Sequence, residues 1–333
     1  MKKILTLTTV LIILSSLVAG YIVNKDMFAG KSPEKPTLKV GYLPITHSLG
    51  VVVADKLYQG KYKNFNLELV RFSSWPELSE ALNSGHIQGA SILLPLAIGS
   101  MEKGVNLQVM ALSHRDGNAM VVANDINTIK DLKGKRVAIP DRMSVHYILL
   151  FQALKDSGMT LDDVQWIEMP PPDMPAALAN GDIKGYIVAE NFGAQAVVGG
   201  YGKLLFKGQD VLPDECCCGY VLNKDFKEKY PDATQEFIDS IVHAGQFIDN
   251  NRTGAIGIGK QYMKMDDKVW EKSFEWGIKF SDLKPTREDL DTLQKYMVEL
   301  KLIKAPLSMD KLLDDSFVSR AYQKGGGGTN EAS

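Results

Sequence analysis

The chain carries its three cysteines side by side, at Cys216, Cys217 and Cys218. Adjacent thiols could ligate a metal, act as a nucleophile or line an apolar site. A disulfide within the run is unfavourable, because bridged residues need Cα atoms about 4.4–6.8 Å apart and chain neighbours lie about 3.8 Å apart. In a strand, Cys216 and Cys218 would face one way and Cys217 the other. The five histidines show no spacing typical of metal ligands, so we predict no metal site.

Two groups of polar residues stand where an expected strand gives way to an expected helix. Free N–H groups and the helix dipole favour anions at such helix starts. The serines in these groups could instead be simple N-caps. The first group is Thr46, His47 and Ser48, and the second is Arg142, Ser144 and His146.

Two further candidates for ligand contact follow expected β runs. Trp75, in "RFSSWPEL", could stack on a ligand in a cleft or fill the core. Glu190, in "GYIVAENFG", could face the same cleft or be a solvated carboxylate. We predict that both residues contact the ligand.

Composition places the chain among globular proteins with a substantial core. It has 333 residues, of which 45% are hydrophobic and 23% are charged. The net charge is −2 and no basic stripe is present, which argues against a nucleic-acid partner.

The two ends of the chain differ from the rest. Residues 1–23 begin with "MKK" and continue with an apolar run, which predicts a signal peptide, or an anchor if it stays uncleaved. Tyr21 follows "LVAG" where a bacterial lipoprotein would have its lipidated cysteine, so we expect no lipid. Residues 24–37 read as a linker and residues 324–333 as a disordered tail. The protein is therefore expected in the periplasm or at the outer face of the cytoplasmic membrane.

An internal repeat predicts two similar lobes. Pro76–Ile92 aligns without gaps on Pro172–Val188, at an offset of 96 residues, and the same offset relates Ser48 to Ser144. Short β runs alternate with helical patterns throughout this region, which is typical of an α/β fold.

The repeat and the helical sequence that follows it predict the domain boundaries. Lobe 1 comprises residues 38–116 together with 226–323, and lobe 2 comprises residues 117–225. A ligand cleft is expected between the lobes, since open α/β sheets bind ligands at the carboxyl ends of their strands.

A resemblance to a known family lies in stretches such as "GYLPITHSLG", "SWPELSEALNSGHIQGASILLPLAI", "ALSHRDGNAMVV" and "DVLPDECCCGYVLNKDF". Together these resemble the nitrate/sulfonate/taurine-type solute-binding proteins of ABC importers, over roughly residues 38–320. The resemblance implies the type II fold of periplasmic binding proteins, with ligand held between two lobes. Leu94, Asn118 and Cys216 lie in these stretches and complete the predicted ligand contacts.

The chain departs from that family at two expected ligand-facing turns. Relatives often carry Asp before His where this chain has Thr46 and His47, and "GEP" where it has Ala189, Glu190 and Asn191. The usual ligand of the family therefore need not carry over. Relatives commonly have a cysteine pair where this chain has three, which favours a structural or ligand-lining role for the run.

The resemblance implies a binding protein and not an enzyme. It would capture a small solute by lobe closure and deliver it to a membrane permease and its ATPase, as a monomer and without a cofactor. A nitrate-, sulfonate- or taurine-like anion is the first expectation. The alternatives are a thiamine-precursor-like pyrimidine stacked on Trp75, or an enzyme on the same fold that uses the cysteines of the run Cys216–Cys218.

Overall fold

The computed structural model of the protein describes residues 35–325. The predicted signal segment, most of the predicted linker and residues 326–333 of the predicted tail lie outside the described residues. Among the helices that are described, none combines the length and the apolar character that crossing a membrane requires.

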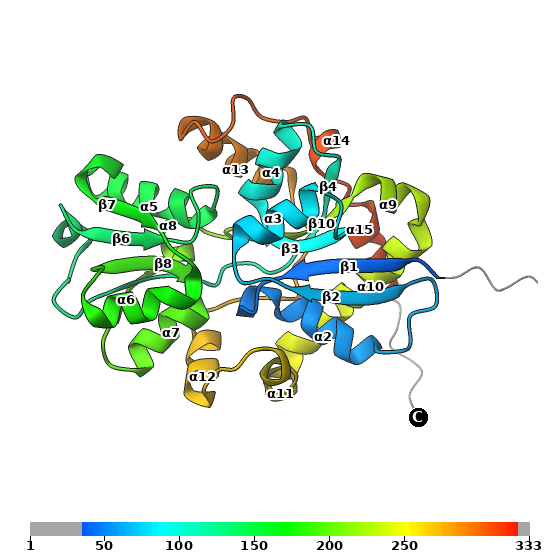
Figure 1. Cartoon of the computed structure of the whole chain (residues 1–333), viewed down its shortest axis with the longest axis horizontal. Helices are drawn as coiled ribbons and strands as arrows, with labels where there is room; N and C mark the ends of the chain where they lie inside the picture. The colour runs from blue at the N-terminus through cyan, green and yellow to red at the C-terminus, as the bar shows by residue number, and fades with distance from the viewer. Residues whose placement is uncertain (1–34, 326–333) are drawn as a thin grey trace, which may run out of the picture. The chain divides into compact units, whose positions relative to one another are not determined.

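Lobe 1 is built on a mixed five-stranded sheet (Figure 1). In spatial order its strands are β2 (Asn66–Arg71), β1 (Thr37–Tyr42), β3 (Gly89–Leu93), β10 (Cys218–Asn223) and β4 (Leu107–Leu112). β1 runs parallel to β2 and β3, whereas β10 inserts antiparallel between β3 and β4. β3 and β4 are buried along their whole length, which explains their almost continuous apolar sequences.

Lobe 2 repeats this plan with its own five strands. In spatial order these are β7 (Gln165–Glu168), β6 (Arg136–Ile139), β8 (Gly185–Ala189), β5 (Asn118–Val122) and β9 (Lys203–Lys207). β6 runs parallel to β7 and β8, and β5 inserts antiparallel between β8 and β9. The two-lobed α/β fold expected from the sequence is therefore confirmed.

The predicted 96-residue repeat is visible in the element boundaries. β3 and β8 begin 96 residues apart, and so do β4 and β9. The helices that follow β3 and β8, α4 and α7, also begin at this offset. The helices of the two repeats are η1 (Thr46–Ser48), α2 (Leu49–Tyr58), α3 (Trp75–Asn83) and α4 (Leu94–Glu102) in lobe 1, and η2 (Ile129–Leu132), α5 (Val145–Asp156), η3 (Leu161–Asp163), η4 (Pro171–Asp173), α6 (Met174–Asn180), α7 (Glu190–Val198) and α8 (Gly208–Val211) in lobe 2.

The chain passes twice between the lobes, and each passage delivers the inserted strand of a sheet. The first passage, residues 113–117, leads from β4 to β5, and the second, residues 212–217, leads from α8 to β10. β10 was expected in lobe 2, whose predicted boundary was residue 225, but it pairs with β3 and β4 of lobe 1. The predicted boundary was wrong because β3 and the edge strand β4 do not pair with each other and need β10 between them, which an internal repeat alone does not reveal.

The C-terminal helices cover lobe 1 and reach lobe 2. α10 packs against α2 and α15, α11 packs against α2, and α12 packs against α7 of lobe 2. Gly193 in α7 permits the close packing of α7 against α12, because a Cβ there would lie 2.8 Å from the ring of Trp276. The helices are α9 (Lys224–Lys229), α10 (Pro231–Asn250), α11 (Arg252–Tyr262), α12 (Asp267–Glu275), α13 (Arg287–Glu299), α14 (Met309–Leu312) and α15 (Ser316–Gly325).

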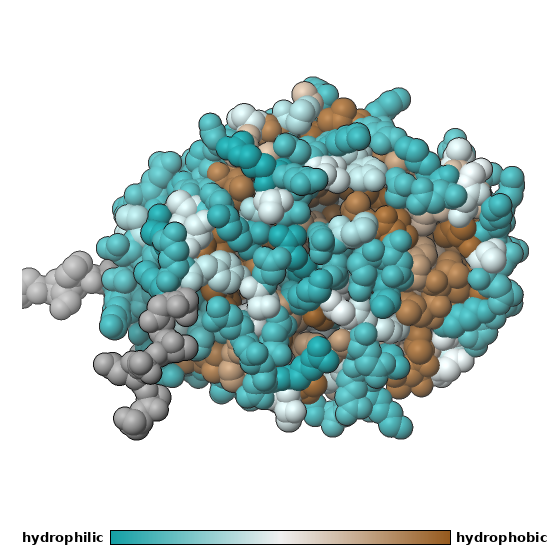
Figure 2. Space-filling model, turned by 180° about the vertical axis from the view of Figure 1, so that it is seen from behind, coloured by the Kyte–Doolittle hydropathy of each residue, from teal (hydrophilic) through white to brown (hydrophobic). Residues whose placement is uncertain are grey.

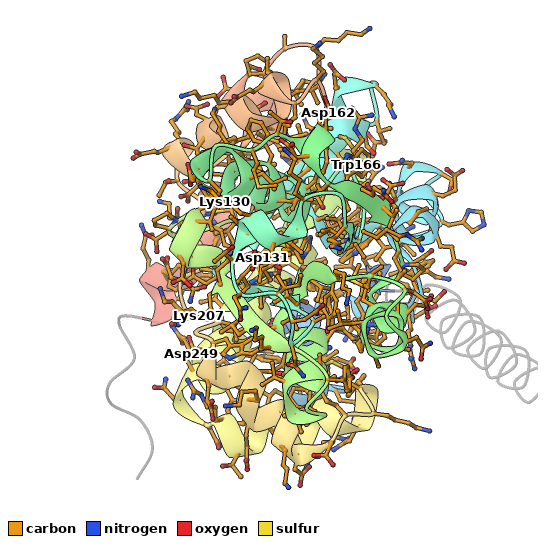
Figure 3. The ribbon with its side chains drawn as sticks, turned by 90° about the vertical axis from the view of Figure 1, so that its left-hand side faces the viewer. Lys130, Asp131, Asp162, Trp166, Lys207 and Asp249 are labelled. Atoms are coloured by element: carbon orange, nitrogen blue, oxygen red, sulfur yellow. The ribbon has the colours of Figure 1, made fainter. Side chains whose placement is uncertain are left out.

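The surface is mostly polar. On the face seen in Figure 2, apolar side chains gather on the side that holds lobe 2. Figure 3, which faces lobe 2, places the exposed Lys130, Asp131 and Asp162 on its outer side. Asp131 there accepts hydrogen bonds from the N–H groups of Asn127 and Thr128 and so stabilises the start of η2.

Candidate functional site

Side chains from three separate segments meet in one buried group, which we call the Cys/His cluster: His47, His114, Cys217 and Cys218. One potential metal-binding atom from each residue lies within 4.8 Å of the others, and all four residues are buried. His47 lies in η1, directly after β1, and His114 lies in the first passage, after β4. Cys217 ends the second passage and Cys218 begins β10. The cluster therefore sits at the carboxyl end of β1, where open α/β sheets bind ligands.

The ring of His47 makes contacts through both nitrogens. Its Nε2 lies 3.1 Å from the carbonyl oxygen of Gly117 and 3.1 Å from Oε2 of Glu190. Both of these atoms are acceptors, so Nε2 carries the proton and donates. Its Nδ1 lies 3.8 Å from Sγ of Cys218. Burial lowers the pKa of His47, but its interactions with Cys217 and with the Glu190 carboxylate outweigh burial and raise the pKa to about 10.

His114 is held in the tautomer that leaves Nε2 free of a proton. Its Nδ1 donates to the carbonyl oxygen of Asp116 at 2.8 Å, and the two histidine ring centroids are 3.8 Å apart. Burial and the charge of nearby His47 hold the pKa of His114 well below its usual value, so its ring is neutral. Its Nε2 is buried and has no hydrogen-bond partner among the described residues.

The sulfurs of Cys217 and Cys218 face the same cluster, 3.7 Å apart. This differs from the alternation expected of a strand, because β10 begins only at Cys218 and Cys217 belongs to the irregular passage before it. Cys216 turns away, with its sulfur 3.5 Å from Nη1 of Arg115. Burial raises the pKa of Cys217 well above its usual value, and the neighbouring His47 opposes this shift only in part.

Lobe 2 reaches the cluster through the start of α7. Glu190 is fully buried there, and its Oε1 has no hydrogen-bond partner among the described residues, whereas Oε2 faces His47. Next to it, Asn191 accepts a hydrogen bond of 3.0 Å from the hydroxyl of Thr46. These two contacts join lobe 1 directly to lobe 2.

Other buried polar groups surround this junction. Asn118 donates its backbone N–H to Oε1 of Glu215 and lies 3.9 Å, through Oδ1, from the sulfur of Cys217. Burial raises the pKa of Glu215 to about 7. Burial and nearby His47 hold the pKa of His146 well below its usual value, and neither of its ring nitrogens has a partner in the described part of the chain.

Several predicted site residues thus lie around one point. Thr46, His47, Asn118 and Glu190 contribute side-chain contacts. Leu94 takes part through its backbone, since its N–H donates to the carbonyl oxygen of Cys217 at 3.0 Å.

The two matched serines differ in the structure. Ser144 caps α5, because its hydroxyl accepts from the N–H of Tyr147 at 3.2 Å. Ser48 makes no side-chain cap, and its buried hydroxyl has no partner among the described residues. The N-cap alternative therefore describes Ser144 and not Ser48.

The remaining predicted residues lie apart from these contacts. Arg142 has an exposed side chain, and its backbone N–H donates to Glu168. Trp75 begins α3, is 2% exposed and belongs to the hydrophobic core. Cys216 lines a separate cavity of about 450 Å³ together with Arg115 and Asp289.

Five site residues were missing from the predicted ligand contacts: His114, Asn191, Glu215, Cys217 and Cys218, since the cysteine run had contributed only Cys216. Metal-ligand spacing offered no signal, because the members of the cluster come from segments that only the fold brings together. The signal that was available was the position of each residue directly after or before an expected strand. The cluster also shows that a lack of local histidine spacing is no guide to sites assembled from distant segments.

Comparison with known proteins identifies the family of this chain. Residues 31–257 match the NMT1-like family. The taurine-binding periplasmic protein of Escherichia coli (strain K12) is 31% identical over 220 residues, which cover 62% of this chain and 65% of that protein. The chain thus spans slightly less than two thirds of that relative's length.

Two solved structures resemble the fold. The ligand-binding component of an ABC-type import system from Staphylococcus aureus, solved with zinc bound, superposes with a TM-score of 0.81 at 34% identity, covering 86% of this chain and 99% of that one. The periplasmic aliphatic sulphonate binding protein of Escherichia coli gives a TM-score of 0.71 at 23% identity, over 85% of this chain and 93% of that one, and shows the fold alone. The chain therefore belongs to the NMT1-like family, with the two-lobed fold of type II periplasmic binding proteins and kinship to the nitrate/sulfonate/taurine solute-binding proteins.

Proposed function

We propose that this protein is the extracytoplasmic solute-binding component of an ABC importer, which closes its two lobes on a small solute and delivers the solute to a permease. The observation that carries this proposal is the pair of buried hydrogen bonds between the lobes, His47 to Glu190 and Thr46 to Asn191. Contacts that exist only when two lobes meet are what a closing binding protein requires, because a solute can drive closure only through interactions made in the closed state.

The relatives support the same function. The Escherichia coli relative is named for taurine binding, and the Staphylococcus aureus relative for ligand binding in an ABC-type import system. A periplasmic relative also supports the expected place of this protein outside the cytoplasm.

Two classes of solute follow from these relatives. Taurine carries an anionic sulfonate, whereas the Staphylococcus aureus protein was solved with zinc bound. Buried Glu190 and Glu215 lie close to the lobe junction, and the Arg142 side chain is exposed. The positive charge of His47 is already paired with Glu190, and Glu215 adds a second buried carboxyl group, so the charges at this junction favour the second class over the anion expected from the sequence.

The geometry does not favour the enzyme alternative. A cysteine nucleophile acts as a thiolate, whose formation requires a lowered pKa. Burial raises the pKa of Cys216 and of Cys217 above the usual value. These thiols suit a buried binding site better than nucleophilic catalysis.

Solute uptake by a host strain that lacks this chain tests the function. Cells would be supplied in turn with taurine, an alkanesulfonate, nitrate and Zn²⁺, and uptake of one of them should be lost in the deletion strain. The intact chain should restore that uptake, and Thr46→Val, which removes the hydrogen bond to Asn191, should restore it less well. Thr253→Val, at an exposed position of α11, is the matched control. Unchanged uptake of all four solutes in the deletion strain would contradict the proposal.

A further inference from the structure

The spacing of the Cys/His cluster fits one tetrahedrally bound metal ion. Two sulfurs, each about 2.3 Å from Zn²⁺ at the tetrahedral angle, lie about 3.8 Å apart, and a sulfur and a nitrogen about 3.6 Å apart. The sulfurs of Cys217 and Cys218 are 3.7 Å apart, and Nδ1 of His47 is 3.8 Å from the sulfur of Cys218. His114 offers the fourth atom within the same 4.8 Å limit. Two of these distances therefore already match a tetrahedral site, and the others, all within 4.8 Å, exceed the tetrahedral values by at most about 1.5 Å.

Both histidines are oriented as metal-binding histidines usually are. In protein metal sites, the ring nitrogen that does not bind the ion donates a hydrogen bond to a carboxylate or a backbone carbonyl. His47 donates through Nε2 to Glu190 and to the carbonyl of Gly117, and His114 donates through Nδ1 to the carbonyl of Asp116. The nitrogens left over are Nδ1 of His47, which points to Cys218, and the unpartnered Nε2 of His114.

The types of ligand atom select the class of ion. Two thiolates with two imidazoles suit Zn²⁺ or Cu⁺, whereas Mg²⁺ and Ca²⁺ take oxygen ligands. On binding, the two thiols of Cys217 and Cys218 and the protonated Nδ1 of His47 lose their protons to solvent, and the resulting thiolates neutralise the charge of a divalent ion. A neutral centre of this kind can be buried between two lobes at little electrostatic cost.

The placement of the ligands connects ion binding to lobe closure. His47 and Cys218 belong to lobe 1, and His114 and Cys217 lie in the two passages between the lobes. Lobe 2 adds Glu190, which holds the outer nitrogen of His47. An ion bound at Nδ1 of His47 keeps the proton on Nε2, and that proton is the one donated to lobe 2.

We propose that His47, His114, Cys217 and Cys218 bind one thiolate-seeking transition-metal cation, Zn²⁺ in the first instance, and that this cation is the imported solute. This inference rests on the function proposed above and names its class of solute. Ion capture by lobe 1 and the two passages then completes the surface on which lobe 2 closes through Glu190.

Direct metal binding to the purified full chain, kept reduced, tests the site. Elemental analysis after Zn²⁺ loading should give one ion per chain, and Co²⁺ loading should give the intense near-ultraviolet band of thiolate-to-cobalt charge transfer. Zn²⁺ should displace Co²⁺, and excess Mg²⁺ should not. If the intact, folded chain takes up neither Zn²⁺ nor Co²⁺, nor Cu⁺ supplied under reducing conditions, the proposal is wrong.

The three neighbouring cysteines provide a matched comparison. Cys217→Ser and Cys218→Ser should each lower Zn²⁺ affinity by about 100-fold or more, since loss of a mere outer partner of a metal ligand already costs about 10–100-fold. Cys216→Ser, in the same run but turned toward Arg115, should bind Zn²⁺ as the intact chain does. His114→Gln tests the site independently if a cysteine variant does not fold. Equal Zn²⁺ affinity in Cys216→Ser and Cys217→Ser would overturn the assignment of these ligands.

Uptake separates this inference from the proposed function. Loss of Zn²⁺ uptake in the deletion strain, restored by Cys216→Ser and not by Cys217→Ser, would support both. Loss of taurine, alkanesulfonate or nitrate uptake alone would leave the importer function standing and overturn the metal as its solute. Tight Zn²⁺ binding by a chain whose deletion affects no uptake would overturn the importer function and, with it, the metal as cargo.

Discussion

At the scale of single residues, Glu190 combines two properties. One carboxylate oxygen accepts the proton of His47 Nε2, and the other is buried without a partner among the described residues. At the same place in the repeat, lobe 1 has Leu94, so the two lobes differ in charge at an equivalent position. Because of this asymmetry, the carboxylate that contacts the His47 ring comes from lobe 2.

Glu190→Gln should lower Zn²⁺ affinity by about 10–100-fold, because a neutral amide is a weaker acceptor for the outer nitrogen of a metal-binding histidine. Competition with a chelating dye would measure the affinity, and thermal unfolding would check the fold. Glu80→Gln, at an exposed position of α3, is the control and should change neither quantity. An unchanged Zn²⁺ affinity in Glu190→Gln would show that the contact with His47 plays no part in binding.

Asp141, just before α5, makes the stability depend on pH. Burial raises its pKa from 3.8 to about 6, assisted by the charge of Glu168 and opposed by the N–H of Met143. The folded state therefore binds this proton more tightly than the unfolded state, and the free energy of unfolding contributed by Asp141 falls as pH rises from about 4 to 6.

Asp141→Asn should remove this pH dependence. Asn can still accept from the N–H of Met143, so the variant should be more stable than the intact chain at pH 7, by at most about 3 kcal/mol for a pKa shift of this size. Urea unfolding at several pH values between 4 and 7 would measure the difference. A difference of the same size at pH 4 and at pH 7 would contradict the ionisation argument.

At the scale of elements, the serines at the two equivalent helix starts are expected to differ in stability and not only in ligand contact. Ser144→Ala removes the cap of α5 and should cost about 1 kcal/mol of unfolding free energy. Ser48→Ala removes a buried hydroxyl with no partner in the described chain and should cost close to nothing. Urea unfolding of the two variants would measure the difference. Equal losses of unfolding free energy would show that the two serines have the same structural role, as their equivalent positions in the repeat suggest.

Helices and strands were predictable from the sequence where local sequence patterns determine them. The pairing of strands that are distant in the chain was not predictable. Apolar runs and the 96-residue offset predicted β3, β8 and the helices after them, because burial and helix starts leave local patterns. The partner of β10 was not predictable, since antiparallel insertion between β3 and β4 depends on strands more than 100 residues earlier in the chain.

The residues of the candidate site were likewise predictable only in part. His47 and Glu190 were predicted because they follow expected strands, and Asn118 was predicted from the family resemblance. The orientation of Cys217 was not, because two-residue alternation applies inside a strand and Cys217 lies just outside one. His114 also follows an expected strand, but its role arises only when the first passage approaches β10.

At the scale of the whole molecule, Arg115 joins the passages between the lobes to the C-terminal helices. Its guanidinium is buried and pairs with Asp289 of α13 at 3.0 Å and with Asp282. It also donates to the carbonyl of Asp214 in the second passage. This one side chain therefore connects both passages to α13.

Arg115→Ala should cost about 3–5 kcal/mol of unfolding free energy, because it leaves Asp289 and several carbonyl groups without their buried partner. Arg287→Ala is the control: it loses only an exposed pair with Asp310 at 3.9 Å and should cost less than about 1 kcal/mol. Denaturant unfolding would compare them. Similar small losses in both variants would show that Arg115 does not hold the passages in place.

The insertion of β10 has a consequence for the order in which the chain can fold during synthesis. All five strands of lobe 2 lie in one continuous segment, from β5 to β9, so its sheet can form as soon as Lys207 has been made. The sheet of lobe 1 must wait, because β3 and β4 become neighbours of β10 only after Asn223 has been added. Lobe 1, whose first strands are synthesised first, is thus the lobe whose sheet is completed last. A fragment of the chain that ends at Lys207 should therefore protect the amides of β8 from hydrogen exchange while those of β4 still exchange freely.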